Sequence, residues 1–282
     1  MAEEKQPVLF VGHGGGPLFL MTVPEGNPAK GFDSTSPAAK KIAAYFEKKF
    51  AGRSNPSSIL VVSAHWEGNE DLEILVKDPP DLFFDYYGFP AETYKYTYPC
   101  RFSPSLADKV QNLLENAGVK CSRNASRGLD HGVFIPLMLL LPDASIPVVQ
   151  LSLHRSLDAN LHLKVGQILA PLRSQGVFIL GSGMATHNMN HNQGKSDSKP
   201  EPWAKSFQDW LDETLMRVPS EETAERLKNW DKVAPNARKA HPREEHLMPL
   251  HVIAGAAGEE KLVKEWDGWA EGHFSLASYG TI

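Results

Sequence analysis

The chain has 282 residues, with 29 Lys and Arg against 34 Asp and Glu, and a formal net charge of −5. This mildly acidic balance, without long basic runs, argues against binding to nucleic acid or to an anionic membrane surface. Two cysteines, Cys100 and Cys121, are too few for a disulfide framework or a four-thiolate zinc site, and eleven histidines are the one unusual feature of the composition.

The order of apolar runs and helix-start signals predicts alternating strands and helices. Apolar runs of four to seven residues bounded by turn residues are typical of buried strands. Ser-Pro pairs at 36–37 and 103–104 mark helix starts, since Pro suits the first helical position. In chain order we expect strands at 8–11, 58–63, 72–76, 147–153 and 177–180, and helices at 37–50, 103–116, 158–174, 202–216, 220–229 and 244–257.

This alternation predicts an α/β fold whose central sheet is mostly parallel or mixed and is flanked by helices. The strands are almost continuously apolar, which indicates that helices cover both faces of the sheet. Nothing resembling a linker divides the chain. The most polar stretch, 188–202, is short and is interpreted as a surface loop. We therefore expect a single domain over residues 1–282, with its core beginning near residue 8.

No segment predicts a membrane span. The most apolar run, 133–141, is interrupted by Pro136 and is about half as long as a bilayer requires. The first residues, Met-Ala-Glu-Glu-Lys-Gln-Pro, are polar and are not followed by the apolar core of a signal peptide. We expect a cytoplasmic enzyme.

Three histidines stand at equivalent places in this predicted fold. His13, His65 and His187 each follow the carboxyl end of a predicted strand. Ligands of open α/β sheets bind at that edge, where the strands give way to loops. The three imidazoles are therefore expected to converge although they are far apart in the sequence.

Each histidine motif also has an explanation that needs no ligand. His13 lies in the glycine-rich run 12–17, which fits a tight turn and lacks the patterns of a phosphate-binding loop. His65 follows an apolar strand and fits a core histidine bonded to a backbone carbonyl. His131 follows Asp130, whose carboxylate can orient an imidazole and raise its basicity, but the pair also fits an exposed turn.

The other histidines divide in the same way. In the charged segment near residue 245, either Glu245 or His246 could be a metal ligand, or the segment is an ordinary helix start. His187 and His191 have the spacing of a chelating pair on a helix, but the asparagines around them disfavour a helix. We assign the rest to surface or supporting positions: His154, His162, His241, His251 and His273.

Taken together, the motifs resemble the class III extradiol ring-cleaving dioxygenases, in the branch that contains bacterial and plant DOPA 4,5-dioxygenases. The matching segments run in family order from about residue 8 to the C-terminus. They are Gly-His-Gly at 12–14, Ser-Ala-His-Trp at 63–66, Gly-Phe-Pro-Ala at 88–91, Gly-Leu-Asp-His-Gly at 128–132, Ile-Pro-Val-Val-Gln-Leu-Ser at 146–152, Gly-Ser-Gly-x-Ala-Thr-His-Asn at 181–188, Pro-Trp-Ala at 202–204 and Glu-His-x-x-Pro-Leu-His at 245–251.

The resemblance implies a non-haem Fe(II) held by His13, His65 and His246. It implies that His187 is the acid/base near the metal, or a fourth ligand when Zn(II) occupies the site, and that His131 contacts the substrate and helps to move protons. The implied reaction opens the ring of a DOPA-like catechol at the 4,5 position with both atoms of O2. The implied partners are thus a small-molecule catechol and O2.

The residue types suit this chemistry. Neutral imidazoles bind Fe(II) while leaving positions open for a chelating catechol and O2, and a histidine can remove a catechol proton near neutral pH. The aromatic segment with Phe83, Phe84, Tyr86, Tyr87 and Phe89 could wall the substrate ring, with Tyr86 and Phe89 as substrate-binding residues. Ordinary loop packing explains these aromatic residues equally well.

Two departures from the family pattern and two other function classes stay open. Many extradiol enzymes use a carboxylate as the third ligand, which keeps Glu245 beside His246. Relatives often carry His-Asp-Phe where this chain has Phe84-Asp85-Tyr86, which leaves the substrate open. The same histidines could serve a zinc-dependent hydrolase or a non-catalytic protein that binds a metal or a catechol.

Overall fold

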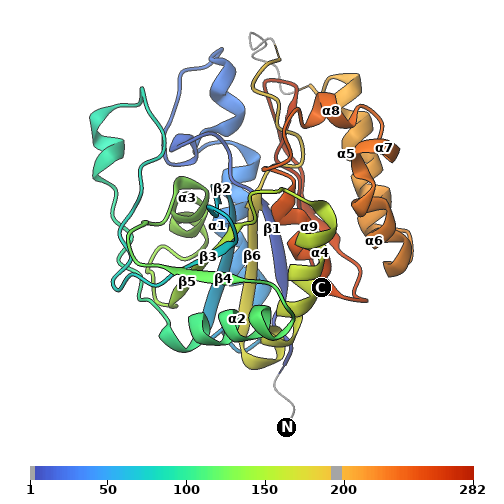
Figure 1. The fold of residues 1–282 in the computed structure, drawn as a ribbon. Coiled ribbons are helices and arrows are strands. Elements are labelled where there is room, and N and C mark those ends of the chain that lie inside the picture. Colours follow the sequence, from blue (N-terminus) through green and yellow to red (C-terminus); the bar gives the residue numbers. More distant parts are fainter. Residues whose placement is uncertain (1–3, 192–198) are drawn as a thin grey trace.

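An eight-stranded mixed sheet forms the centre of the computed structural model, which describes residues 4–191 and 199–282 (Figure 1). The strands of this sheet are β1 (Val8–Gly12), β2 (Ser58–Glu67), β3 (Leu72–Leu75), β4 (Cys121–Asn124), β5 (Val148–Leu153), β6 (Val177–Gly183), β7 (Val263–Trp266) and β10 (Ser278–Gly280). Their order is β4-β3-β5-β2-β6-β1-β10-β7. A separate two-stranded ribbon joins β8 (Trp269–Ala270) to β9 (Phe274–Ser275).

The middle of the sheet is parallel and its flanks are not. β2 pairs in parallel with β5 and β6, and β6 pairs in parallel with β1. The pairs β3–β5, β1–β10 and β10–β7 are antiparallel, and β3–β4 is parallel. The prediction of an α/β fold with a mixed sheet is confirmed, and the carboxyl ends of β1, β2 and β6 lie side by side.

Helices cover both faces of the sheet, as expected from its apolar strands. The helices are α1 (Pro37–Phe50), α2 (Pro104–Asn116), α3 (His131–Leu140), α4 (Ala159–Leu169), α5 (Pro202–Met216), α6 (Ser220–Lys228), α7 (Trp230–Val233), α8 (Ala237–Ala240) and α9 (Met248–Ala257), with 3-10 turns at Leu18–Leu20, Pro28–Phe32, Ala91–Lys95 and Ala170–Gln175. α1 and α3 pack on one face, and α2, α4 and α9 pack on the other. α5 and α6 lie at one side of the molecule (Figure 1).

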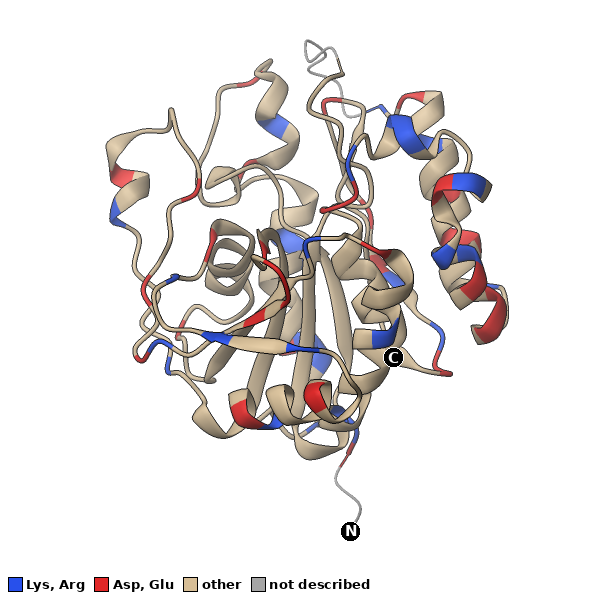
Figure 2. Cartoon of the chain, viewed as in Figure 1, with Lys and Arg blue, Asp and Glu red and all other residues tan. Residues whose placement is uncertain are grey.

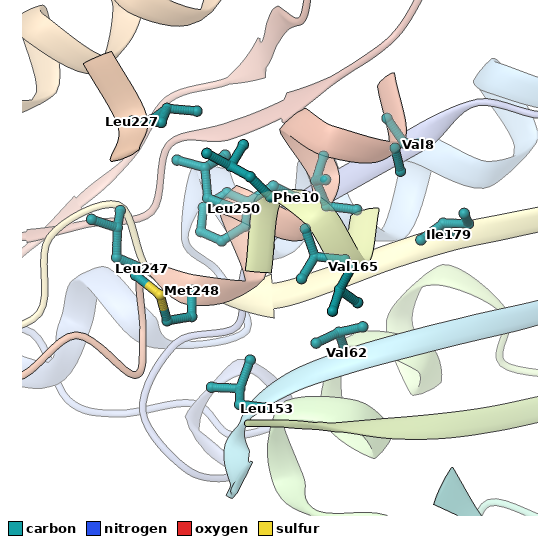
Figure 3. Packing of buried hydrophobic residues seen from close by; sticks show 14 of the residues in the cluster. Val8, Phe10, Val62, Leu153, Val165, Ile179, Leu227, Leu247, Met248 and Leu250 are labelled. Atoms are coloured by element: carbon teal, nitrogen blue, oxygen red, sulfur yellow. The ribbon is translucent and has the colours of Figure 1, made fainter. Parts of the chain in front are cut away.

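Successive side chains of β1 belong to two hydrophobic clusters, one on each face of the sheet. Val8 and Phe10 join the cluster that includes α4 and α9, seen in Figure 3, whereas Leu9 and Val11 join the cluster under α1 and α3. Successive side chains of a strand point to opposite faces, so an apolar strand fills both.

The predicted helix starts agree with the capping atoms. The Ser36 side chain accepts a hydrogen bond from the Ala39 backbone N–H at 3.2 Å, and Ser103 accepts one from Leu106 at 3.3 Å. Such caps satisfy backbone donors that a helix leaves unpaired at its first turn. Charged side chains are frequent on the outer helices α5 and α6 (Figure 2). Within the residues described, no helix has the length and apolarity to cross a bilayer.

Several elements differ from the sequence prediction. The apolar run near residue 133 forms α3, which is buried around most of its circumference and therefore shows no amphipathic period. α9 begins at Met248 rather than at residue 244, with Pro249 in its first turn. β2 extends to Glu67, so His65 lies within the strand rather than beyond it. The short elements were not predicted either, because they span only two to four residues and are too short to show a pattern: β4, β7, β8, β9, β10, α7 and α8.

Candidate metal centre

Five histidines gather at the carboxyl edge of the central strands. His13 follows β1, His65 lies near the end of β2, and His187 comes four residues after β6. His131 is the first residue of α3, and His246 precedes α9. The ring centroids of His13 lie 4.9 Å from His65, 5.5 Å from His131 and 5.2 Å from His246. The structure thus brings together all five histidines that the resemblance implied.

The ligand atoms fall into two adjoining groups. His13, His65 and His131 offer ring nitrogens within 4.8 Å of one another, and His187, Glu245 and His246 form a second such group. The two groups touch, because the rings of His65 and His246 lie 4.9 Å apart and those of His187 and His246 stack at 3.5 Å. His246 therefore lies beside the pair His13–His65, as does His131.

Hydrogen bonds fix the proton of His13. The Ser182 hydroxyl donates its only proton to the Gly132 carbonyl, so it accepts at 2.9 Å from the Nδ1–H of His13. The Nε2 atom of His13 then carries a lone pair. It faces the Nε2 atom of His65 at 3.1 Å.

Asp85 fixes two further imidazoles. One of its oxygens lies 2.8 Å from Nδ1 of His131 and also accepts from the His131 backbone N–H at 2.9 Å. The other oxygen lies 3.3 Å from Nδ1 of His65. Burial raises the pKa of Asp85, but its hydrogen bonds to His131 and its electrostatic attraction to His131 and His65 together outweigh burial and hold this pKa below its usual value. An ionised carboxylate accepts only, so both histidines keep Nδ1–H and present Nε2.

Asp130 does not orient its neighbour His131, contrary to the sequence interpretation. Its buried carboxylate accepts hydrogen bonds from the Ser63 hydroxyl at 2.7 Å and from Gln150 Nε2 at 2.6 Å. Asp130 precedes α3, and its carboxylate bonds to side chains of β2 and β5. It therefore ties α3 to the sheet beneath the histidines, and Asp85, distant in sequence, holds His131 instead.

Glu245 supports the second group. Its Oε1 atom lies 2.9 Å from Nδ1 of His246 and 3.7 Å from Nδ1 of His187. Its other oxygen lies 3.3 Å from Arg243, which pairs through two nitrogens with Glu67 at 2.6 Å. This geometry leaves Nε2 of His246 free to ligate and gives Glu245 the place of a supporting carboxylate.

Burial keeps these imidazoles neutral. Desolvation lowers the pKa of His13, His65 and His246 well below the usual value, and the neighbouring imidazoles lower it further. Burial likewise lowers the pKa of His187 to about 4. Neutral imidazole is the form that binds metal, because the protonated ring has no lone pair to give.

The donor set fits a divalent transition metal. His13, His65 and His246 present their Nε2 atoms to a shared space. Their Nδ1 atoms are held by the Ser182 hydroxyl, the Asp85 carboxylate and the Glu245 carboxylate, respectively. Two lone pairs that face each other at 3.1 Å repel unless a cation lies between or beside them. Nitrogen ligands of this kind suit iron and zinc, and the supporting acceptors are those found around metal-bound histidines.

An open pocket of about 500 Å³ leads to the histidines. Tyr86, Tyr87 and Phe89 line it, as do His65, His131, His187 and His246. Phe83 and Phe84 do not. Phe83 packs against the Arg127 guanidinium at 4.9 Å, and Phe84 against Phe134 at 5.5 Å between ring centroids. Three of the five aromatic residues therefore have the position expected of a substrate wall, and two belong to the loop's own packing.

The glycines beside His13 are required by space and backbone. Gly14 and Gly16 both have positive φ, at 80° and 52°, a region that L-residues with a side chain rarely adopt. A Cβ atom on Gly16 would stand 3.0 Å from the Phe89 ring. The glycine-rich run therefore lets the loop pass close to the aromatic wall of the pocket.

Four histidines assigned to surface or supporting positions are in fact buried: His162, His241, His251 and His273. They lie outside the centre. His241, for example, lies 3.0 Å from the Ala185 carbonyl oxygen, and His162 lies 2.7 Å from that of Asp158. His191 bonds to Glu201 at 3.0 Å rather than chelating with His187. The polar run after it falls at 192–198, outside the described residues.

Sequence comparison identifies the class of protein that this fold and centre belong to. Residues 8–280 match the model of a family described as the catalytic LigB subunit of aromatic ring-opening dioxygenase. The chain belongs to this family and is an oxidoreductase of the ring-cleaving kind, as the resemblance predicted.

Particular relatives carry more specific descriptions. The chain is 42% identical to a 4,5-DOPA dioxygenase extradiol of Beta vulgaris over 92% of this chain and 93% of that protein. It is 38% identical to one of Portulaca grandiflora, over 90% and 92%, and 32% identical to one of Escherichia coli K12, over 99% and 95%. A crystal structure of an uncharacterized Escherichia coli K12 protein superposes with a TM-score of 0.75 at 29% identity, covering 98% of this chain and all of the other.

Proposed function

We propose that this protein is an Fe(II)-dependent extradiol dioxygenase that opens the ring of a DOPA-like catechol, by 4,5-cleavage, with both atoms of O2. The observation that carries the proposal is the cluster of neutral imidazoles at the end of an open pocket, in a chain of the ring-opening family. The substrate class follows from the descriptions of its relatives. A cytoplasmic location stays a prediction from the sequence.

His13, His65 and His246 are proposed as the metal ligands. His65 and His246 have Nδ1 held by Asp85 and Glu245, and Ser182 holds that of His13, so the three rings are oriented without the metal. Fe(II), when bound there, would supply Lewis acidity toward the catechol oxygens and pass electron density from the catechol to O2. Zn(II) suits the same nitrogens.

Glu245 and His131 are the competing third ligands. Glu245 already accepts from His246 at 2.9 Å and contacts Arg243, so its oxygens are engaged. His131 lies 4.0 Å from His65 between ring centroids, which is close enough to compete with His246. Metal titration of His131→Ala and His246→Ala shows which of the two histidines is the third ligand. We expect His246→Ala to lose far more affinity for the metal than His131→Ala.

His187 is proposed as the acid/base, and His131 as a substrate contact that moves protons. Neutral His187 can accept the proton of a catechol hydroxyl, and the Glu245 carboxylate 3.7 Å from its Nδ1 stabilises the imidazolium so formed. His131 keeps its proton on Nδ1 toward Asp85, so its Nε2 can accept a hydrogen bond from the second hydroxyl. Tyr86 and Phe89 wall the ring.

Anaerobic loading with Fe(II), followed by O2 and a panel of catechols, tests the function. We expect oxygen uptake with L-DOPA and a ring-opened product whose mass increases by two oxygen atoms. If the iron-loaded protein consumes no oxygen with any catechol, the proposal fails. Activity with Zn(II) but not with Fe(II) on ester or amide substrates would instead indicate a hydrolase.

A further inference from the structure

One carboxylate oxygen at the pocket lacks a hydrogen-bond partner within residues 4–191 and 199–282. Glu271 lines the pocket together with Met184, Phe274 and the histidines. Its Oε2 atom is buried and has no hydrogen-bond partner among the described residues. Glu271 also has a positive φ of 52°, which places a bulky residue in a backbone conformation that usually belongs to glycine. No role in the metal centre explains this residue.

The surroundings of Glu271 do not neutralise it. The described lining of the pocket contains two acidic side chains, Asp85 and Glu271, and no Lys or Arg. Asp85 is engaged with two histidines. Lys30, which borders a neighbouring hollow with Glu271, pairs instead with Asp33 at 3.0 Å and Glu25 at 3.1 Å.

Glu271 is half-buried, and a carboxylate oxygen withdrawn from water without a cation or hydrogen-bond donor is costly. Burial raises the pKa of Glu271, as expected of a carboxyl group that no positive charge offsets. A bound group that brings both a positive charge and N–H donors would remove this cost. An ammonium group does both, and charge-assisted hydrogen bonds to a carboxylate are among the stronger polar contacts.

We propose that Glu271 is a specificity-determining residue that binds the ammonium group of a catecholic amine. The inference rests on the proposed function, since a catechol whose oxygens face the histidines turns its substituent toward the rest of the pocket lining, which includes Glu271. It adds an order of preference. A cationic catechol such as dopamine and a zwitterionic one such as L-DOPA should bind better than 3-(3,4-dihydroxyphenyl)propionate, which keeps a carboxylate and lacks the amine.

Glu271→Gln tests the proposal, because it removes the charge and keeps the shape. For L-DOPA and dopamine we expect the variant to lower kcat/KM by about 10- to 100-fold, the usual worth of one charge-assisted contact. For 4-methylcatechol, which has no charged substituent, kcat/KM should stay within about twofold. Glu259→Gln is the matched control, because it makes the same charge change at an exposed position. It should leave kcat/KM unchanged for all three catechols.

Binding in the absence of O2 separates this inference from the proposed function. Dissociation constants of the four catechols are measured anaerobically by calorimetry with the wild type and both variants. If no catechol is ring-opened but the amines still lose affinity in Glu271→Gln alone, the proposed function fails and the Glu271 assignment holds. If L-DOPA, dopamine and 4-methylcatechol all weaken equally, or none does, the assignment is wrong.

A purely structural role is tested by thermal unfolding. Removing a half-buried charge with one unpartnered oxygen should leave the Tm of Glu271→Gln equal to or above that of the wild type. A fall in Tm together with an equal loss for all catechols would overturn the proposal. Glu271→Asp retains the charge on a shorter arm and should keep a preference for amines, reduced in size.

Discussion

Two groups of buried histidines in this fold illustrate how burial and function differ. At the metal centre, His13 and His246 have a lowered pKa because they are buried. Away from it, His162 and His251 also have a lowered pKa for the same reason. Neither burial nor the direction of the pKa shift therefore distinguishes a metal ligand from a packed core residue.

The surroundings of the second ring nitrogen distinguish the metal-centre histidines from the packed ones. His162 accepts at Nε2 from the His154 backbone N–H at 3.2 Å, and its Nδ1 lies 2.7 Å from the Asp158 carbonyl oxygen. The two nitrogens of His251 lie within 3.1 Å of backbone carbonyls. At the centre, by contrast, Nδ1 is held and Nε2 faces other imidazoles. Several inward-facing nitrogens in one space, rather than buried histidines as such, indicate a metal site.

Removing one imidazole from each group gives the largest expected difference. His65→Ala should abolish ring opening and weaken metal binding by more than about a hundredfold. Loss of a residue that only supports a ligand usually costs about 10- to 100-fold, and loss of a ligand should cost more. His251→Ala should bind metal with unchanged stoichiometry, although it destabilises the fold because a buried ring and its one N–H donor are lost beside the Leu247 and Leu227 carbonyls. Metal analysis after dialysis measures both. Full metal occupancy of His65→Ala would contradict the ligand assignment.

The next largest effect concerns proton transfer. His187→Ala should lower kcat by about 10²- to 10⁴-fold, because a positioned general acid/base is worth that much, while metal content changes little. His191→Ala is the matched control four residues away, and we expect near wild-type turnover, since His191 bonds to Glu201 and does not line the pocket. Unchanged kcat in His187→Ala would refute its role.

Asp85→Asn tests whether the held Nδ1 atoms matter. The amide keeps the shape but cannot accept from both His65 and His131 as a carboxylate does, so we expect Co(II) or Zn(II) affinity to fall about 10- to 100-fold. Competition titration against a chromophoric chelator measures this. Asp81→Asn, an exposed aspartate paired with Lys77, should leave the affinity unchanged. Equal affinity in both variants would show that Asp85 is dispensable.

The smallest expected effect is a pH dependence of the free energy of unfolding, caused by His162, a buried histidine away from the metal centre. Burial lowers the pKa of His162 from 6.5 to about 4, so the unfolded chain takes up a proton first as the pH falls. The stabilisation is complete above pH 6.5 and is lost between pH 6.5 and about 4, by about 2 kcal/mol between pH 7 and pH 5. Urea unfolding at both pH values should show a shallower loss in His162→Gln than in the wild type. Parallel losses would contradict it.

Most of the parallel core and the five histidines of the centre could be predicted from the sequence, because short sequence patterns indicate both. Apolar strand runs and Ser-Pro starts are local, and His13 directly follows its strand while His187 lies four residues beyond its own. What local rules could not predict are contacts between distant segments. The partner of His131 is Asp85 rather than the adjacent Asp130, since the latter turns toward the sheet.

Elements without a periodic pattern were missed for a similar reason. α3 is apolar all round because it is enclosed by neighbours, and a period appears only when one face meets water. Glu271 had no motif around it. Its interest comes from an unpaired oxygen at a pocket wall, which only the assembled molecule reveals.

The antiparallel pairing of β10 with β1 has a consequence for how the centre is made. The Gly12 backbone N–H, one residue before His13, donates to the Ser278 hydroxyl at 3.0 Å, and Leu9 and Phe10 pair with Gly280 and Tyr279. These contacts join segments separated by about the whole chain, and such pairings close late in folding. During synthesis the first histidine must therefore wait for nearly the last residues. The strand that leads to His13 is thus completed on one side by the last strand of the chain, and a truncation before residue 278 removes the partners of Gly12, Leu9 and Phe10 together.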